Sequence, residues 1–160
     1  MKKILILTVL LLAAGLPLFA SDGIVGVGVE AGYPYSGVTV DFSFNEKWGG
    51  YVTAGYGYGY SGFLAIVGSN VKVAEIELNN TNPININVGV QGVLPLTTLF
   101  RYGLFSMAVH GTVGASYDFE EIPLTAYIRS GFGVVLAPVP GYGIICDFSW
   151  DAVLGAVYHF

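Results

Sequence analysis

Apolar side chains alternate with small or polar ones along nearly the whole chain after residue 23. A period of two is typical of β-strands whose two faces meet different surroundings. The alternation is clearest over residues 84–91, where isoleucine and valine alternate with asparagine, glycine and glutamine. The pattern predicts eight strands, at residues 24–33, 37–44, 51–60, 62–78, 84–91, 103–119, 123–136 and 152–160.

The fourth predicted strand is irregular, because its apolar face continues into Glu75 and Glu77. A β-bulge near Ala74 would return Ile76 and Leu78 to the apolar side. Turns are predicted at residues 45–48, 79–83 and 120–123. Residues 94–102 and 137–151 are expected outside the regular strands, and the apolar residues of the second segment either fold over a barrel mouth or extend the strands. These are Ile144, Ile145 and Phe148.

The two faces of the strands are unusual for a soluble protein. A water-exposed sheet face carries many charged residues, yet charged residues make up only 11% of this chain, against roughly 25% in soluble domains. The simplest solution turns the apolar face toward lipid and the small or polar face toward a narrow interior. Open sheet edges cannot exist in lipid. The sequence therefore predicts an all-β fold, a closed antiparallel up-and-down transmembrane β-barrel of about eight strands.

Aromatic residues at strand ends agree with this interpretation, because aromatic girdles mark both interfaces of membrane barrels. The alternative is a soluble, lipocalin-like barrel with an aromatic core, which would have to expose many valines and isoleucines. An even number of strands places both termini on the periplasmic side. The predicted girdle residues are Tyr33, Tyr35, Phe44, Trp48, Tyr60, Phe119, Trp150, Tyr158 and Phe160.

The N-terminus has the pattern of a secretory signal peptide. Lys2 and Lys3 precede an apolar run that breaks at Gly15 and Pro17, and this run is too short for a membrane-spanning helix. We expect cleavage after Ala20, which divides the chain into a signal peptide (1–20) and a barrel (21–160). An uncleaved N-terminal anchor is the alternative.

Charge and cysteine content exclude several classes of function. Without Lys2 and Lys3 the chain has four basic residues against eleven acidic ones, a formal net charge of −7. Nucleic-acid binding, which needs clustered lysine and arginine, is therefore not expected. The single Cys146 makes neither an internal disulfide nor a cysteine-based metal site, and we expect no metal and no cofactor.

The most informative polar residues are those predicted to point inward. An unpaired charge in a narrow apolar lumen is costly, so Arg129 is expected to have a carboxylate partner. Two interpretations remain, a plug of ion pairs and hydrogen bonds or a gated solute pathway. Eight strands leave an interior just wide enough for side chains, which favours a mostly filled lumen. The predicted network is Glu30, Asp41, Gln91, His110, Asp118 and Arg129.

Catalytic candidates are weak, and we expect no enzymatic activity. Ser106, His110 and Asp118 share a strand face, but residues four apart along a strand are about 13 Å apart, too far for a nucleophile and its base. The glycine-rich stretches lie within strands, not before a helix as a nucleotide-binding loop requires. A lipid-acting enzyme with His110 as base is a minor alternative.

The C-terminus resembles the assembly signal of outer-membrane β-barrel proteins, with alternating apolar residues over 154–160, Tyr158 third from the end and Phe160 last. In size and pattern the chain resembles small barrels of the OmpA, OmpX and OmpW type, and residues 123–129 and 32–34 resemble OmpA-like barrels of spirochaetes. The resemblance implies outer-membrane lipid, the barrel assembly machinery and periplasmic chaperones as partners, and no catalytic residues. We expect a structural or surface-interaction role with an unknown surface ligand, with a narrow pore or transporter as the alternative.

Overall fold

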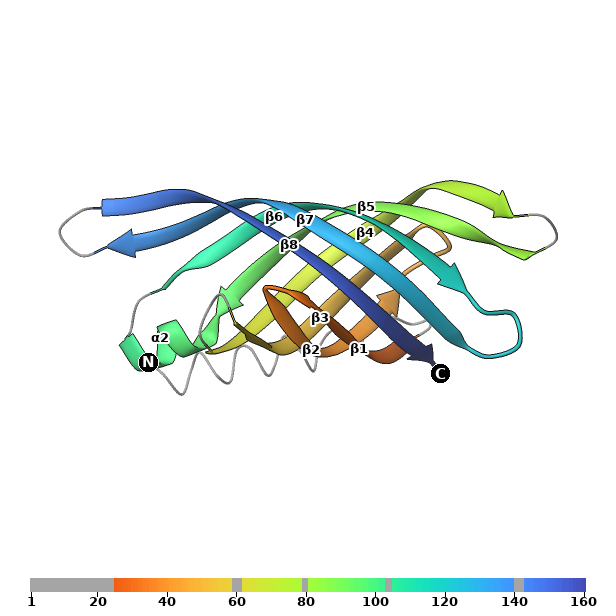
Figure 1. Ribbon diagram of the computed structural model, residues 1–160, viewed down its shortest axis with the longest axis horizontal. Coiled ribbons are helices and arrows are strands. Elements are labelled where there is room, and N and C mark those ends of the chain that lie inside the picture. The colour runs from red at the N-terminus through yellow and green to blue at the C-terminus, as the bar shows by residue number, and fades with distance from the viewer. Residues whose placement is uncertain (1–24, 59–61, 79–80, 103–104, 140–142) are drawn as a thin grey trace.

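The computed structural model describes residues 25–58, 62–78, 81–102, 105–139 and 143–160. The expected signal peptide (1–20) lies outside these residues. Eight antiparallel strands form a closed barrel in the order β1 to β8, and β8 pairs with β1 to close the ring (Figure 1). The predicted fold class, an up-and-down barrel of eight strands, is confirmed.

The strands differ greatly in length. β1, β2 and β3 have 9 or 10 residues, whereas β4, β5, β7 and β8 have 15 to 17. No helix in the described part of the chain is long and apolar enough to cross a membrane. The elements are β1 (Val25–Tyr33), β2 (Tyr35–Ser43), β3 (Trp48–Gly57), β4 (Gly62–Leu78), β5 (Thr81–Pro95), α2 (Leu96–Tyr102), β6 (Met107–Asp118), β7 (Leu124–Val139) and β8 (Gly143–His159).

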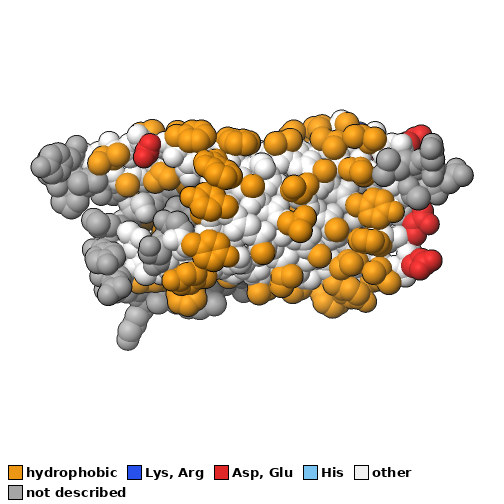
Figure 2. Space-filling view, viewed as in Figure 1, with side chains coloured by type: hydrophobic (Ala, Val, Ile, Leu, Met, Phe, Trp, Pro, Cys, Tyr) orange, Lys and Arg blue, Asp and Glu red, His pale blue; other side chains and the backbone are white. Residues whose placement is uncertain are grey.

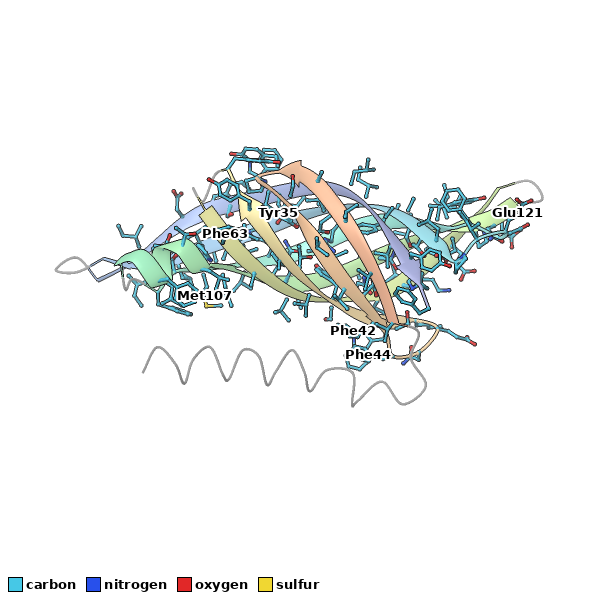
Figure 3. All side chains as sticks on the ribbon, turned by 90° about the horizontal axis from the view of Figure 1, so that it is seen from below. Tyr35, Phe42, Phe44, Phe63, Met107 and Glu121 are labelled. Atoms are coloured by element: carbon cyan, nitrogen blue, oxygen red, sulfur yellow. The ribbon has the colours of Figure 1, made fainter. Side chains whose placement is uncertain are left out.

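The barrel has two different ends. We call the end at which β1 begins and β8 finishes the terminal end; the β2–β3, β4–β5 and β6–β7 connections also lie there. The opposite end, with the β1–β2, β3–β4 and β7–β8 connections and α2, is the far end. Figure 3 shows Glu121 at the terminal end and Phe63 and Met107 at the far end. The β4–β5 hairpin projects at the terminal end and the β7–β8 hairpin at the far end (Figure 1).

The strands extend further than the sequence pattern predicted in several places. Residues 137–151 are not a separate external segment, because β7 continues to Val139 and β8 begins at Gly143. Pro138 is tolerated in β7 because it lies beyond Leu136, the last residue that pairs with β6. The alternative in which the apolar residues of this segment extend the strands is therefore correct.

Two smaller boundaries were also wrong because the strands extend further than the sequence pattern predicted. β5 starts at Thr81, so Asn82 and Pro83 belong to the strand and not to the predicted turn. Leu94 also belongs to β5, and α2 occupies the rest of the segment 94–102. The predicted bulge in β4 is confirmed, since the register with β5 shifts between Lys72 and Ala74.

The inner face has little room where neighbouring strands cross closely. A Cβ atom at Gly133, on the inner face of β7, would lie 1.8 Å from the carbonyl oxygen of Val109 on β6. At Gly111, on the outer face of the same ladder, the nearest atom would be the Phe132 carbonyl oxygen at 4.0 Å. Glycine is therefore required at position 133 and is replaceable at position 111.

We expect Gly133→Ala to lower the free energy of unfolding by about 1–3 kcal/mol, because the methyl group forces β6 and β7 apart. Gly111→Ala is the matched control and should be neutral or stabilise by about 0.4–1 kcal/mol. Urea unfolding of the refolded barrel in lipid vesicles, followed by tryptophan fluorescence, measures both. Equal effects of the two substitutions would contradict the close approach at Gly133.

Candidate functional site

The half of the lumen nearest the far end is filled with apolar side chains. Leu64 and Ile66 of β4, Val93 of β5, Ala108 of β6 and Val153 of β8 are each at most 2% exposed and form one cluster with Tyr35 and Tyr51. The partly buried Tyr127 and Val135 pack against this cluster. We call the aliphatic members of this cluster the apolar plug; it lies toward the far end of the barrel and consists of Leu64, Ile66, Val93, Ala108, Val135 and Val153.

Below the plug lies a buried carboxylate, Glu30 of β1, which has three side-chain donors. Thr53 Oγ1 of β3 donates to Glu30 Oε1 over 2.7 Å. Tyr127 and Arg129 of β7 both donate to Glu30 Oε2, over 2.6 and 2.8 Å. Because a buried carboxylate without donors is strongly disfavoured, this arrangement stabilises the charge through donors from two other strands, β3 and β7.

A second buried network lies beside the first. Asp151 Oδ2 of β8 accepts hydrogen bonds from Gln91 Nε2 of β5 at 2.6 Å and from His110 Nδ1 of β6 at 2.5 Å. Gln91 in turn accepts a hydrogen bond from the Tyr51 hydroxyl of β3 at 2.7 Å. His110 and Asp151 are at most 1% exposed.

Arg129 connects the two networks. Its guanidinium carbon lies 3.9 Å above the centre of the Tyr51 ring, a cation–π contact, while Nη2 bonds Glu30 and approaches the Tyr35 hydroxyl at 3.4 Å. The combined set, which we call the lumen layer, takes side chains from every strand except β4. Its members are Glu30, Tyr35, Tyr51, Thr53, Gln91, His110, Tyr127, Arg129 and Asp151.

The half of the lumen nearest the terminal end is hollow. A cavity of about 420 Å³ lies there, with Arg129 and Tyr51 among its lining residues. Most of the residues that line it are polar, and they include Asp41 of β2, Asn70 of β4 and Asn87 of β5. The expectation of a mostly filled lumen therefore describes the far half and the lumen layer but not the terminal half.

The six residues predicted for the lumen network divide into two groups. Glu30, Gln91, His110 and Arg129 lie together in the lumen layer. Asp41 lines the terminal cavity. Asp118 also lines it but is exposed at the rim, where it accepts hydrogen bonds from Thr125 and Asn85.

The position predicted for Tyr35 in the aromatic girdle is wrong. It was expected at a membrane interface, but it is fully buried inside the barrel, next to Arg129. The predicted strand began at residue 37, whereas β2 begins at Tyr35. Tyr35 therefore shares the inward face of Thr39 and Asp41, because side chains two apart on a strand point the same way.

Comparisons with known proteins place the fold in context. No family model matches the chain, and no curated protein matches it. Among solved structures, the barrel is similar to the crystal structure of the N-terminal β-barrel domain of Pseudomonas aeruginosa OprF, with a TM-score of 0.43 and 10% sequence identity. The similarity covers 86% of this chain and 96% of that one.

Several members of the lumen layer were missed from the sequence although a signal for them exists. Asp151 was assigned to an external segment, yet the inward parity of His159 and Val157 leads back along β8 to Asp151. Tyr51 and Tyr127 share the predicted inner faces of β3 and β7. This parity is the signal that places them inside the barrel, but the sequence does not show which polar groups their hydroxyls contact.

The layer has the features of a structural network. Among the described residues there is no group of three histidine, cysteine, aspartate or glutamate side chains that could hold a metal ion. His110 bonds Asp151 deep in the barrel, whereas Asp118 lies at the rim. His110 and Asp118, two of the three catalytic candidates considered in the sequence, are thus engaged in separate networks.

A double-mutant cycle tests the Glu30–Arg129 pair. Arg129→Met should lower the free energy of unfolding by about 3–5 kcal/mol, because it leaves the Glu30 charge buried without its cation. Adding Glu30→Gln should restore part of this loss, with a coupling energy of about 1–3 kcal/mol. Urea unfolding in vesicles measures all four proteins. Strictly additive effects would contradict the pairing in the lumen layer.

Proposed function

We propose that the protein is an integral barrel of a bacterial outer membrane with a structural or surface-interaction role and no open channel. The observation that carries this proposal is the direction of the charged side chains. In the strand segments paired on both sides, the charged residues Glu30, Asp41 and Arg129 all point into the barrel. A soluble barrel has the opposite arrangement, whereas a membrane barrel requires an apolar outer face.

The middle part of the outer face is apolar, which also supports the proposal. No outward-facing residue of the doubly paired, described segments is charged. Large apolar side chains are widely exposed there, for example Val29 at 62%, Val90 at 59% and Leu154 at 66%. In Figure 2 hydrophobic side chains are spread over the visible face, and acidic ones appear only near its two ends. Such a surface in water would be a large aggregation-prone patch.

Aromatic ring pairs lie at the two ends of this apolar surface. At the terminal end Phe44 packs on Trp48, Tyr117 on Phe119 and Tyr158 on Phe160. At the far end Tyr33 packs on Trp150 and Tyr56 on Phe63. Two aromatic bands separated by an aliphatic zone are the arrangement expected at the interfaces of a bilayer. Strands of 9 or 10 residues, as in β1 to β3, are long enough to span between them.

The filled lumen favours a closed barrel over a pore or transporter. A solute entering the terminal cavity would meet the lumen layer and then the apolar plug, in which Leu64, Ile66 and Val93 are at most 1% exposed. Conduction would require both to rearrange. A narrow pathway gated by Glu30 and Arg129 is the alternative function, and a lipid-acting enzyme has no supporting geometry.

The proposal includes the partners that such a location demands. Outer-membrane lipid would contact the apolar face, and the barrel assembly machinery with periplasmic chaperones would handle the unfolded chain. Tyr158 and Phe160, which pack together at the terminal end, would serve as the assembly signal. With both chain ends of the barrel in the periplasm, the far end would face the outside.

A charge placed on the outer face tests the membrane location. Val90 lies midway along β5 and is 59% exposed, so Val90→Arg should lower the free energy of unfolding in lipid vesicles by about 2–4 kcal/mol. The control is Ile122→Arg in the exposed β6–β7 turn, where little change is expected. An unchanged stability of Val90→Arg in vesicles would count against the membrane location.

Conductance in a planar bilayer tests the closed lumen. The purified barrel should show no steady single-channel steps, because the apolar plug and the lumen layer close the passage. Steady steps that disappear on altering Arg129 or Glu30 would instead support the gated pathway.

A further inference from the structure

The hollow half of the lumen results from small side chains at inward positions. On β6 the inward residue His110 belongs to the lumen layer, whereas Gly114 and Ser116 line the terminal cavity. Gly49 of β3 lines the cavity in the same way. Because these positions carry no bulky side chain, a volume of about 420 Å³ stays open beside the lumen layer. Sites for small molecules have volumes of about 300–1,000 Å³.

The terminal cavity is closed on one side and open on the other. Tyr51, Tyr127 and Arg129 of the lumen layer are among its lining residues, and the apolar plug lies beyond them. On the other side the lining includes turn residues of the terminal end such as Lys47 and Pro123. A solute would therefore enter and leave through the same mouth, as in a binding pocket and unlike in a channel.

Several polar groups of the cavity wall have unmet hydrogen-bonding capacity. Asp41 and Asn70 line the cavity, and neither makes a side-chain hydrogen bond with another side chain in the described ranges. Arg129 is 7% exposed, and its Nε has no partner within those ranges, although its Nη2 bonds Glu30. Buried polar groups are normally hydrogen-bonded. The wall therefore has both a donor and acceptors to offer a solute.

His159 adds an acceptor, which follows from the direction of its hydrogen bonds. Thr125 donates its single hydroxyl proton to Asp118 Oδ1 over 2.5 Å, so His159 Nε2 must donate across the 2.9 Å contact with Thr125 Oγ1. In the neutral imidazole Nδ1 is then a bare acceptor. This Nδ1 is buried without a partner in the part of the chain that the structure describes, and His159 lines the cavity.

The charges around the cavity favour a neutral ligand. An anion would meet the carboxylate of Asp41, and a cation would meet the guanidinium of Arg129, so each would face a like charge. The acidic and basic residues of the lining balance one another, and its other polar side chains are mainly amides and hydroxyls. The charged lining residues are Asp41, Glu46, Asp118, Lys47, Lys72 and Arg129.

We propose that the terminal cavity binds a neutral polyhydroxylated solute, a sugar of one or two rings. A hydroxyl group both donates and accepts hydrogen bonds, which matches the unsatisfied groups of Arg129, Asp41 and His159. The aromatic rings of Tyr51 and Tyr127 in the lining offer apolar surface to the C–H groups of a sugar.

Other occupants fit the cavity less well. A lipid chain would leave the polar groups of the wall without hydrogen bonds, and a folded partner protein is too large for about 420 Å³. Sugar binding itself does not depend on the proposed function. The proposed function decides only that the sugar enters from the periplasmic side.

The two tryptophans of the chain give a direct readout. Trp48 lines the cavity, whereas Trp150 packs on Tyr33 at the far end. In a Trp150→Phe barrel, refolded in a detergent without a sugar headgroup, the fluorescence of Trp48 reports on the cavity. Titration with glucose should give a saturable change. Glucosamine and glucuronate, its cationic and anionic analogues, should bind about tenfold more weakly or not at all.

Substitutions on the two faces of β6 test the place of binding. Ser116→Phe puts an aromatic ring into the cavity and should abolish the response to glucose. Val113→Phe puts the same ring on the outer face, where Val113 is 47% exposed, and should leave the response unchanged. Heat-modifiable mobility on gels checks that both variants fold.

A second pair of variants tests the hydrogen bonds. Asn70→Leu should weaken glucose binding about tenfold. It should not lower stability, because the Asn70 amide bonds no other side chain in the described segments. Asn82→Leu is the control, since Asn82 lies at the same end and bonds the Asp118 carbonyl outside the cavity lining.

Three results would overturn the proposal. The absence of a saturable response to glucose would show that the cavity takes up only solvent. An equal response in the folded Ser116→Phe and Asn70→Leu proteins would place the sugar elsewhere. A saturable response to glucosamine alone would replace the sugar site by a cation site at Asp41.

Discussion

The structure depends on one constraint: a single closed sheet has apolar side chains on its outside, so every charge of its wall must be accommodated in a narrow interior. Closure satisfies the backbone, since each strand has a neighbour on both sides over the barrel wall. It also brings Glu30 of β1 and Arg129 of β7 to 2.8 Å, although 99 positions separate them in the chain. The lumen layer is therefore a consequence of closure, and it in turn ties β1, β2, β3 and β7 together across the interior.

The interior changes from apolar to polar side chains along the barrel axis. Large apolar residues such as Leu64 and Ile66 fill the far half, and the lumen layer separates them from the polar terminal cavity. The barrel is thus a cup that is open toward its chain ends and closed toward the far end. This asymmetry supports the proposed role on the far surface over the alternative of passage through the lumen. The β7–β8 hairpin extends past β1 at the closed end, and the β4–β5 hairpin extends past β3 at the open end.

The sequence was most informative where local periodicity decides the structure. Alternation predicted the number of strands, the direction of Glu30, Gln91, His110 and Arg129, and the bulge of β4. Proline and glycine near residue 140 misled the strand boundaries, and Asp151 was lost with them. Tyr35 was misplaced because the start of β2 was set two residues too late.

The partners of the inward residues could not be predicted from the sequence. Which residues meet across a barrel depends on the stagger of all eight strands together, and a single sequence contains no direct signal of that stagger. The division into a filled and a hollow half has the same origin. Leu64 on β4 and Val153 on β8 meet in one plug only once the register of every intervening strand is set.

The most direct test of an apolar outer face in lipid is a measurement of which side chains the lipid contacts. Nuclear magnetic resonance of the methyl groups in lipid nanodiscs, with one relaxation agent dissolved in the lipid and another in the water, separates the two faces. We expect Val29, Val90 and Leu154 to be relaxed by the lipid-soluble agent, and Val93 and Val153 of the plug to be affected by neither agent. Relaxation of the outer valines by the water-soluble agent, with no effect of the lipid-soluble one, would contradict the inverted barrel.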